Sequence, residues 1–192
     1  MTAPPAPLPT VVVPARTVFW RIHPRGRDAL WFGPDPSSGP LNRFDAPARE
    51  YGVCYLGDSL EVAVAETLIR VPGPARVVAR ARLHERSASQ LVLREPLRVV
   101  QLEGPGLVRL GASADLVHAF PYGACQRMAL EFWSHPDAVD GIQYRSRWDN
   151  SRLCWALFDR ARDKLGAPLG TLWLGDPNVV VPVLDHYDIG VV

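Results

Sequence analysis

Apolar positions along the chain follow two spacings, which predict strands in some segments and helices in others. Runs of β-branched and aromatic residues that end at glycine, proline or a polar cluster are typical of strands. Such runs occur at 17–23, 51–57, 75–83, 97–102, 141–146, 154–159 and 171–175. Apolar residues at helical spacing predict helices at 58–70 and 122–135. Because strands outnumber helices and do not alternate with them, we predict an α+β fold rather than an alternating parallel α/β sheet.

The helix expected at 58–70 carries one acidic residue in unusual surroundings. Asp58 is a candidate N-cap with Glu61 as its capping-box partner, and the VPGP stretch is expected to end the helix. Glu66 stands in the run AVAETLI, among alanines and a valine. Two interpretations stay open: an ordinary surface pair with Arg70, four residues on, or a carboxylate at the edge of a ligand pocket.

Length and composition fit one compact domain. The chain has 192 residues, 47% of them hydrophobic, which suits a single sizeable core. Five prolines among the first 14 residues predict a flexible or extended lead over 1–15, so the domain is expected to cover 16–192. The segment 33–50 is rich in glycine, proline and serine, and loops of this length are usually functional or disordered.

Charge and hydropathy exclude several classes of protein. The formal net charge is +1, with 21 basic and 20 acidic residues, so no basic excess points to nucleic acid or a membrane surface. No apolar run is long enough to predict a membrane-spanning helix, and the N-terminus lacks the basic region of a secretory signal. We therefore expect a cytoplasmic protein with no direct contact to nucleic acid or membrane.

Cysteines and histidines give no sign of a disulfide framework or a metal site. Cys54, Cys125 and Cys154 are an odd number, widely spaced, which fits a reducing compartment. Cys54 and Cys154 lie in apolar runs, where cysteine usually serves as a small hydrophobic residue. The histidines are scattered without ligand spacing, so no metal is expected.

Four polar residues are candidates for chemistry, although each also has a structural explanation. Arg43, in the long loop, is either a solvated charge or a bidentate anion ligand. Tyr55, in the strand 51–57, is either a core residue or part of a site. Ser146, between two arginines at the end of a predicted strand, is either a turn residue or a donor. Together with Glu66 they form a candidate set. The chain contains no G-x-S-x-G elbow, P-loop or H-E-x-x-H motif.

This set resembles the pattern of the RES-domain family, which comprises NAD-consuming toxins of RES–Xre toxin–antitoxin systems. The matching stretches are NRFDAP with Arg43, GVCYLGDS with Tyr55, VAVAETL with Glu66 and DGIQYRSR with Ser146. The resemblance runs from about residue 18 to near residue 187. It departs from the pattern before Arg43, where PLN replaces glycines, and after it, where Phe44 replaces tryptophan.

The resemblance implies an ADP-ribosyltransferase-like split β-sheet with flanking helices, NAD⁺ as substrate and an Xre-family antitoxin as partner. It also implies site roles. Glu66 would stabilise the cationic ribose as nicotinamide leaves, and Arg43 would bind the pyrophosphate. Tyr55 would pack against nicotinamide or ribose, and Ser146 would bond the ribose or the acceptor.

Alternatives remain open at this point. Arg21 or Arg147 is a second candidate ligand for the pyrophosphate, and Arg43 or Arg147 is a candidate to hold inorganic phosphate as a co-substrate. The acceptor of the ribosyl group is water, phosphate or a protein side chain. A protein ADP-ribosyltransferase is one rival, disfavoured because Val64 stands where many arginine-modifying enzymes carry a second acid. A non-catalytic binding module on the same fold is the other.

Overall fold

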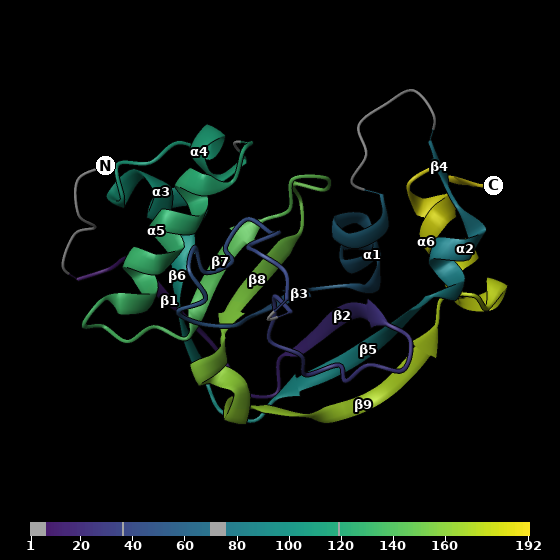
Figure 1. The fold of residues 1–192 in the computed structure, drawn as a ribbon, viewed down its shortest axis with the longest axis horizontal. Coiled ribbons are helices and arrows are strands. Elements are labelled where there is room, and N and C mark those ends of the chain that lie inside the picture. The colour runs from purple at the N-terminus through teal and green to yellow at the C-terminus, as the bar shows by residue number, and fades with distance from the viewer. Residues whose placement is uncertain (1–6, 36, 70–75, 119) are drawn as a thin grey trace.

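The computed structural model describes residues 7–35, 37–69, 76–118 and 120–192. Its main feature is a curled sheet of eight strands in the order β1-β6-β7-β8-β3-β2-β5-β9 (Figure 1). These strands are β1 (Thr10–Val13), β2 (Val18–Pro24), β3 (Val53–Gly57), β5 (Arg86–Leu93), β6 (Leu97–Leu102), β7 (Gly141–Arg145), β8 (Leu153–Phe158) and β9 (Leu165–Trp173). Neighbours pair antiparallel except β6 and β7, which are parallel.

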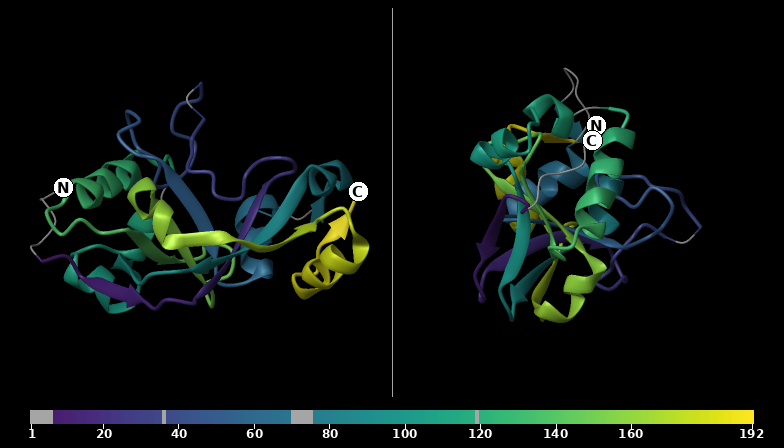
Figure 2. Two further views of the ribbon diagram at one scale, coloured as in Figure 1. Left: turned by 90° about the horizontal axis from the view of Figure 1, so that it is seen from below. Right: turned by 90° about the vertical axis from the view of Figure 1, so that its left-hand side faces the viewer.

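The helices gather in two groups at opposite ends of the sheet (Figures 1 and 2). One group contains α3 (Gly104–Arg109), α4 (Ala114–His118) and α5 (Gly123–Ser134). The other contains α1 (Leu60–Leu68), α2 (Arg80–His84) and α6 (Pro177–His186), beside the small sheet of β4 (Val77–Val78) and β10 (Gly190–Val191). A 3₁₀ helix, η1 (Asp159–Lys164), links β8 to β9. Within the described ranges, no helix has the length and apolar character needed to cross a membrane.

The large sheet is split between β2 and β3. These strands pair at a single position, Trp20 with Gly57, whereas β2 pairs with β5 along its whole length. Beyond that position the two halves diverge, so Arg21 and Tyr55 are left on either side of an opening. The predicted α+β class, with a split sheet and flanking helices in one domain, is confirmed.

The turn from β3 into α1 depends on the missing side chain of Gly57. A Cβ atom there would lie 2.7 Å from Cγ1 of Val62 and 3.2 Å from the main-chain nitrogen of Ala63. Glycine therefore lets α1 start directly against the end of β3. The helix then packs its apolar face, including Val62 and Val64, into the core and carries Glu66 back over the opening.

Two predictions about local structure are wrong. Ser59, not Asp58, caps α1, and its Oγ accepts from the Val62 main-chain nitrogen at 3.3 Å. Asp58 instead accepts from the Leu153 main-chain nitrogen at 2.9 Å, which ties the helix start to β8. The strand expected at 75–83 is only the two residues of β4 followed by α2. The arginines in this segment alternate with other residues as in a strand. The chain nevertheless forms a short helix there, which buries Leu83.

Other elements lie outside the predictions. Part of the lead expected to be flexible belongs to the sheet, because the β-branched run Thr10–Val13 pairs with β6 as β1. The strand β9 begins at Leu165, six residues before the predicted start at 171. Strand β5, next to the edge strand β9, has no apolar alternation, since its buried Ser87 and Ser89 are polar. Ser89 is satisfied by hydrogen bonds to His23 on β2 and Thr171 on β9.

Candidate active site

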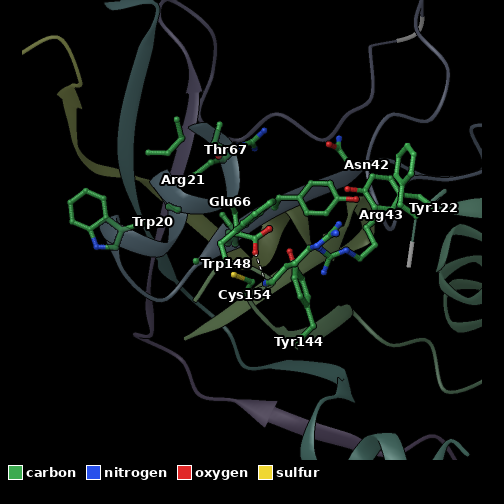
Figure 3. Close-up of a pocket in the computed structure, with 17 residues that line it drawn as sticks. Trp20, Arg21, Asn42, Arg43, Glu66, Thr67, Tyr122, Tyr144, Trp148 and Cys154 are labelled. Carbon is green, nitrogen blue, oxygen red and sulfur yellow. Dashed lines mark hydrogen bonds between the residues drawn. The ribbon is translucent and has the colours of Figure 1, made fainter. Parts of the chain in front are cut away.

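The opening in the sheet leads into a pocket of about 530 Å³ (Figure 3). This volume is within the usual range for small-molecule sites. Its walls come from the strands β2, β3, β7 and β8, the helix α1, the loop before Ala46, the segment just before α5 and the loop after β7. The lining residues that bear on the chemistry are Arg21, Arg43, Tyr55, Glu66 and Arg147.

Glu66 is held by the loop that follows β7. Its Oε1 accepts a hydrogen bond from Oγ of Ser146 at 2.6 Å and another from the Arg147 main-chain nitrogen at 2.9 Å. Both bonds reach one oxygen, so the carboxylate is fixed by that oxygen and can present the other to a ligand. Arg70, the alternative partner of Glu66, lies outside the described residues.

Ser146 fixes the loop as well as the carboxylate. It is fully buried, and its Oγ accepts from the main-chain nitrogens of Trp148 and Asp149, both at 3.1 Å. Asp149 in turn accepts a hydrogen bond from the Tyr187 hydroxyl at 3.0 Å, at the end of α6. A continuous series of hydrogen bonds therefore runs from α6 through the loop to Glu66.

Arg43 is a buried cation in the same pocket as Glu66. Its side chain lies over the ring of Tyr144, with 5.3 Å from Cζ to the ring centroid, and the residue is only 7% exposed. Its Nε and Nη1 atoms are buried and have no hydrogen-bond partner within the described part of the chain. Leaving a buried guanidinium unpaired is costly, so the site is prepared for an anion.

Tyr55 anchors the loop that carries Arg43. Its hydroxyl donates to Oδ1 of Asp45 and accepts from the Phe44 main-chain nitrogen, both at 2.9 Å. Burial, followed by the nearby Asp45 carboxylate, raises the pKa of the Tyr55 phenol well above its usual value. The ring lines the pocket, but the hydroxyl proton is engaged within the protein rather than free for a ligand.

Asp45 organises the same loop and was not among the predicted site residues. It is almost fully buried, and its Oδ2 accepts from the main-chain nitrogens of Leu41 and Asn42, at 2.9 and 2.7 Å. The Asn42 side chain adds a third bond at 3.2 Å. Residues 41–45 therefore fold around the Asp45 carboxylate, with Arg43 in the middle of the segment. The closely spaced asparagine and aspartate of NRFD are the sequence signal for such a turn.

The two other predicted arginines occupy different positions in the pocket wall. Arg21 donates through Nη1 to the carbonyl oxygens of Ala29 and Trp31 and to Sγ of Cys54, so it braces the segment after β2. Arg147 is exposed at the pocket, and its guanidinium lies 5.5 Å from the Trp148 ring centroid. Arg147 is therefore better placed than Arg21 to meet a second anion.

A comparison with models of known protein families assigns the chain to one of them. The family model described as "RES domain" matches residues 18–173. The chain belongs to the RES domain family. It is 30% identical over 112 residues to the probable toxin y4kH of Sinorhizobium fredii (strain NBRC 101917 / NGR234), covering 58% of this chain and 87% of that protein. Its fold is similar to a chain in the crystal structure of the M. tuberculosis MbcT–MbcA toxin–antitoxin complex, with a TM-score of 0.62 and 16% identity, over 84% of this chain and 85% of that one.

In this RES domain, Arg43, Tyr55 and Glu66 line one pocket, and Ser146 bonds Glu66 in its wall. Sequence reasoning missed most of the residues that shape it. Apart from Asn42 and Asp45, these residues have no distinguishing spacing, and they are Trp20, Ile22, Leu56, Gly57, Ala63, Thr67, Phe120, Tyr122, Tyr144, Trp148 and Cys154.

The cysteines of this RES domain are structural. Cys54, Cys125 and Cys154 are all buried thiols. Burial raises the pKa of each thiol above its usual value, so none is activated as a thiolate nucleophile. No cluster of three or more metal-ligating side chains occurs in the described ranges.

We expect Tyr55→Phe to weaken both the fold and the site. The change removes the hydroxyl and leaves the buried Asp45 Oδ1 and Phe44 nitrogen short of a partner, which typically costs about 1–3 kcal/mol. Urea denaturation will measure the free energy of unfolding. Tyr51→Phe is the matched control, because Tyr51 bonds only the Phe44 carbonyl oxygen, and at 3.2 Å. An unchanged unfolding free energy in Tyr55→Phe would contradict this anchoring role.

Proposed function

We propose that this RES domain binds NAD⁺ in the pocket at the split sheet and cleaves the bond between nicotinamide and ribose. The observation that carries the proposal is that one pocket holds both a buried Arg43, whose Nε and Nη1 have no hydrogen-bond partner in the described chain, and an anchored carboxylate, Glu66. A pyrophosphate needs a buried cation, and a developing ribosyl cation needs a fixed anion. NAD⁺ has both features, a pyrophosphate and a ribose that becomes cationic as nicotinamide leaves.

The chemistry requires only one carboxylate. Nicotinamide leaves as a neutral molecule, so no general acid has to protonate it, unlike the leaving group of an ordinary glycoside. Glu66 then stabilises the oxocarbenium-like ribose. The hydrogen bonds from Ser146 and the Arg147 main chain hold its carboxylate in advance, which avoids reorganisation when charge develops.

The acceptor is water or inorganic phosphate. Phosphate would attack C1 of the ribose as nicotinamide departs, giving ADP-ribose 1-phosphate, whereas water would give ADP-ribose and a proton. We assign the phosphate acceptor to the guanidinium of Arg147, because this exposed residue lines the pocket and its main-chain nitrogen bonds Glu66. No metal is needed for either reaction.

Incubating the purified chain with NAD⁺, with and without phosphate, tests the proposal. Nicotinamide release measured by chromatography will report cleavage, and mass spectrometry of the other product will identify the acceptor. A chain that releases no nicotinamide under either condition would overturn the proposed reaction.

Protein ADP-ribosylation is the weaker alternative. Enzymes that modify arginine on related folds often use a second acid two residues before the catalytic glutamate. That position is Val64, which is fully buried in the core cluster of α1 and α6 and does not line the pocket. The chain therefore lacks a group there to activate a protein acceptor.

We further propose that the protein is the toxin of a toxin–antitoxin pair and acts on cytoplasmic NAD⁺. Support comes from the names of its relatives, one a probable toxin and the other part of a toxin–antitoxin complex. An Xre-family antitoxin is the proposed partner. Since the formal net charge is only +1, we expect any contact with DNA to be made by that partner.

Growth arrest tests the toxin proposal separately from the enzymatic one. Expression of the wild-type chain alone is expected to stop growth and lower cellular NAD⁺, and co-expression of its Xre-family antitoxin is expected to restore both. Cell density and NAD⁺ content will be followed after induction. Normal growth at confirmed soluble expression would contradict the toxin assignment, even if the purified chain cleaves NAD⁺.

A further inference from the structure

An aromatic pair extends the pocket beyond Arg43. Phe120 and Tyr122 both line it, and their rings meet edge to face with centroids 5.5 Å apart and an interplanar angle of 86°. Phe120 is 77% exposed, which is high for a large apolar side chain in a pocket wall. An edge-to-face contact covers at most one face of the Phe120 ring, and the high exposure of the residue leaves another face open.

The pair is held next to the Arg43 loop by α5. Gln126, on the first turn of that helix, donates from Nε2 to the Asn42 carbonyl oxygen at 2.9 Å. Tyr122 immediately precedes the helix as its N-cap. The aromatic pair and the arginine therefore belong to one braced wall.

Figure 3 shows how the chemical groups follow one another across the pocket. Asn42, Arg43 and Tyr122 gather at one end, and Trp20, Arg21 and Thr67 lie toward the other, with Glu66 between the two groups. With the reacting ribose at Glu66 and the pyrophosphate at Arg43, the second nucleoside must continue away from Glu66. It then reaches Phe120 and Tyr122.

We infer that Phe120 and Tyr122 form an adenine subsite, in which the flat purine stacks on the open face of the Phe120 ring. This inference rests on the proposed function, because it uses Glu66 and Arg43 to set the direction of the dinucleotide. Stacking suits the site, since every base presents a π face to an aromatic side chain. The subsite makes the enzyme select dinucleotides over mononucleotides that carry the same glycosidic bond.

Binding of ADP and of inorganic pyrophosphate tests the subsite without requiring cleavage. Titration calorimetry on the wild-type chain is expected to show ADP binding at least tenfold more tightly than pyrophosphate, because only ADP has the base. Phe120→Ala is expected to remove most of that difference while leaving pyrophosphate affinity unchanged. Phe120→Trp, which keeps a stacking face, is expected to retain it.

Val108→Ala is the matched control, because Val108 is 80% exposed on α3 and does not line the pocket. It should bind both ligands as the wild type does. Equal affinity of the wild type for ADP and pyrophosphate, or full ADP affinity in Phe120→Ala, would overturn the subsite. Either result leaves NAD⁺ cleavage to be judged by nicotinamide release alone, so the two proposals fail independently.

Discussion

Glu66→Gln is expected to keep the fold and abolish NAD⁺ cleavage. Glutamine has the same size, and its amide oxygen can still accept from the Ser146 hydroxyl and the Arg147 main chain. Only the negative charge is lost. Removing one preorganised group that stabilises a transition state costs roughly 3–4 kcal/mol, or about 10²–10³ in rate. Nicotinamide release at saturating NAD⁺ will measure the loss.

Glu61→Gln is the matched control for this experiment. It makes the same substitution in the first turn of the same helix, at a side chain that does not line the pocket. We expect wild-type turnover from it. If a folded Glu66→Gln variant turned over NAD⁺ as fast as Glu61→Gln, the carboxylate would have a structural role only. Glu66→Gln should also fail to arrest growth when it is expressed alone.

The site could be predicted from the sequence only where local pattern carries the information. Glu66 stands out because a single acid lies among small apolar residues, and Ser146 because a hydroxyl follows a buried strand. Their hydrogen bond joins residues 80 positions apart, and no spacing rule reports such a contact. The split between β2 and β3, which creates the pocket, is equally non-local.

The roles of Tyr55 and Asp45 show a second limit. A tyrosine in an apolar strand can serve as ligand or anchor, and only its hydroxyl partners distinguish the two. Here Asp45 accepts a hydrogen bond from the hydroxyl, so we expect Tyr55 to influence a bound ligand through the loop that holds Arg43. The fold has the same limit. Strand β5 lacks the apolar alternation because its buried polar Ser89 is satisfied across the sheet, whereas Arg80 and Arg82 show the strand spacing within the helix α2.

Arg43→Lys is expected to reduce NAD⁺ affinity although it keeps the positive charge. Lysine is a point charge without the planar fork that bonds two phosphate oxygens at once. The Arg43 guanidinium also lies over Tyr144, and lysine cannot reproduce that flat contact. Loss of a charge-assisted hydrogen bond costs roughly 1.5–3 kcal/mol, so KM should rise about ten- to hundredfold with a smaller change in kcat.

Ligand-dependent stability separates this loss from simple misfolding. Pyrophosphate should raise the Tm of the wild type, because it pairs a buried cation whose Nε and Nη1 have no partner in the described chain. The same concentration should shift the Tm of Arg43→Lys much less. Arg49→Lys, at an exposed arginine of the same loop, is the control and should match the wild type in KM and in Tm shift. An unchanged KM in a folded Arg43→Lys variant would mean that another cation binds the pyrophosphate. Arg147 is then the candidate, because it is exposed in the pocket and its main-chain nitrogen bonds Glu66.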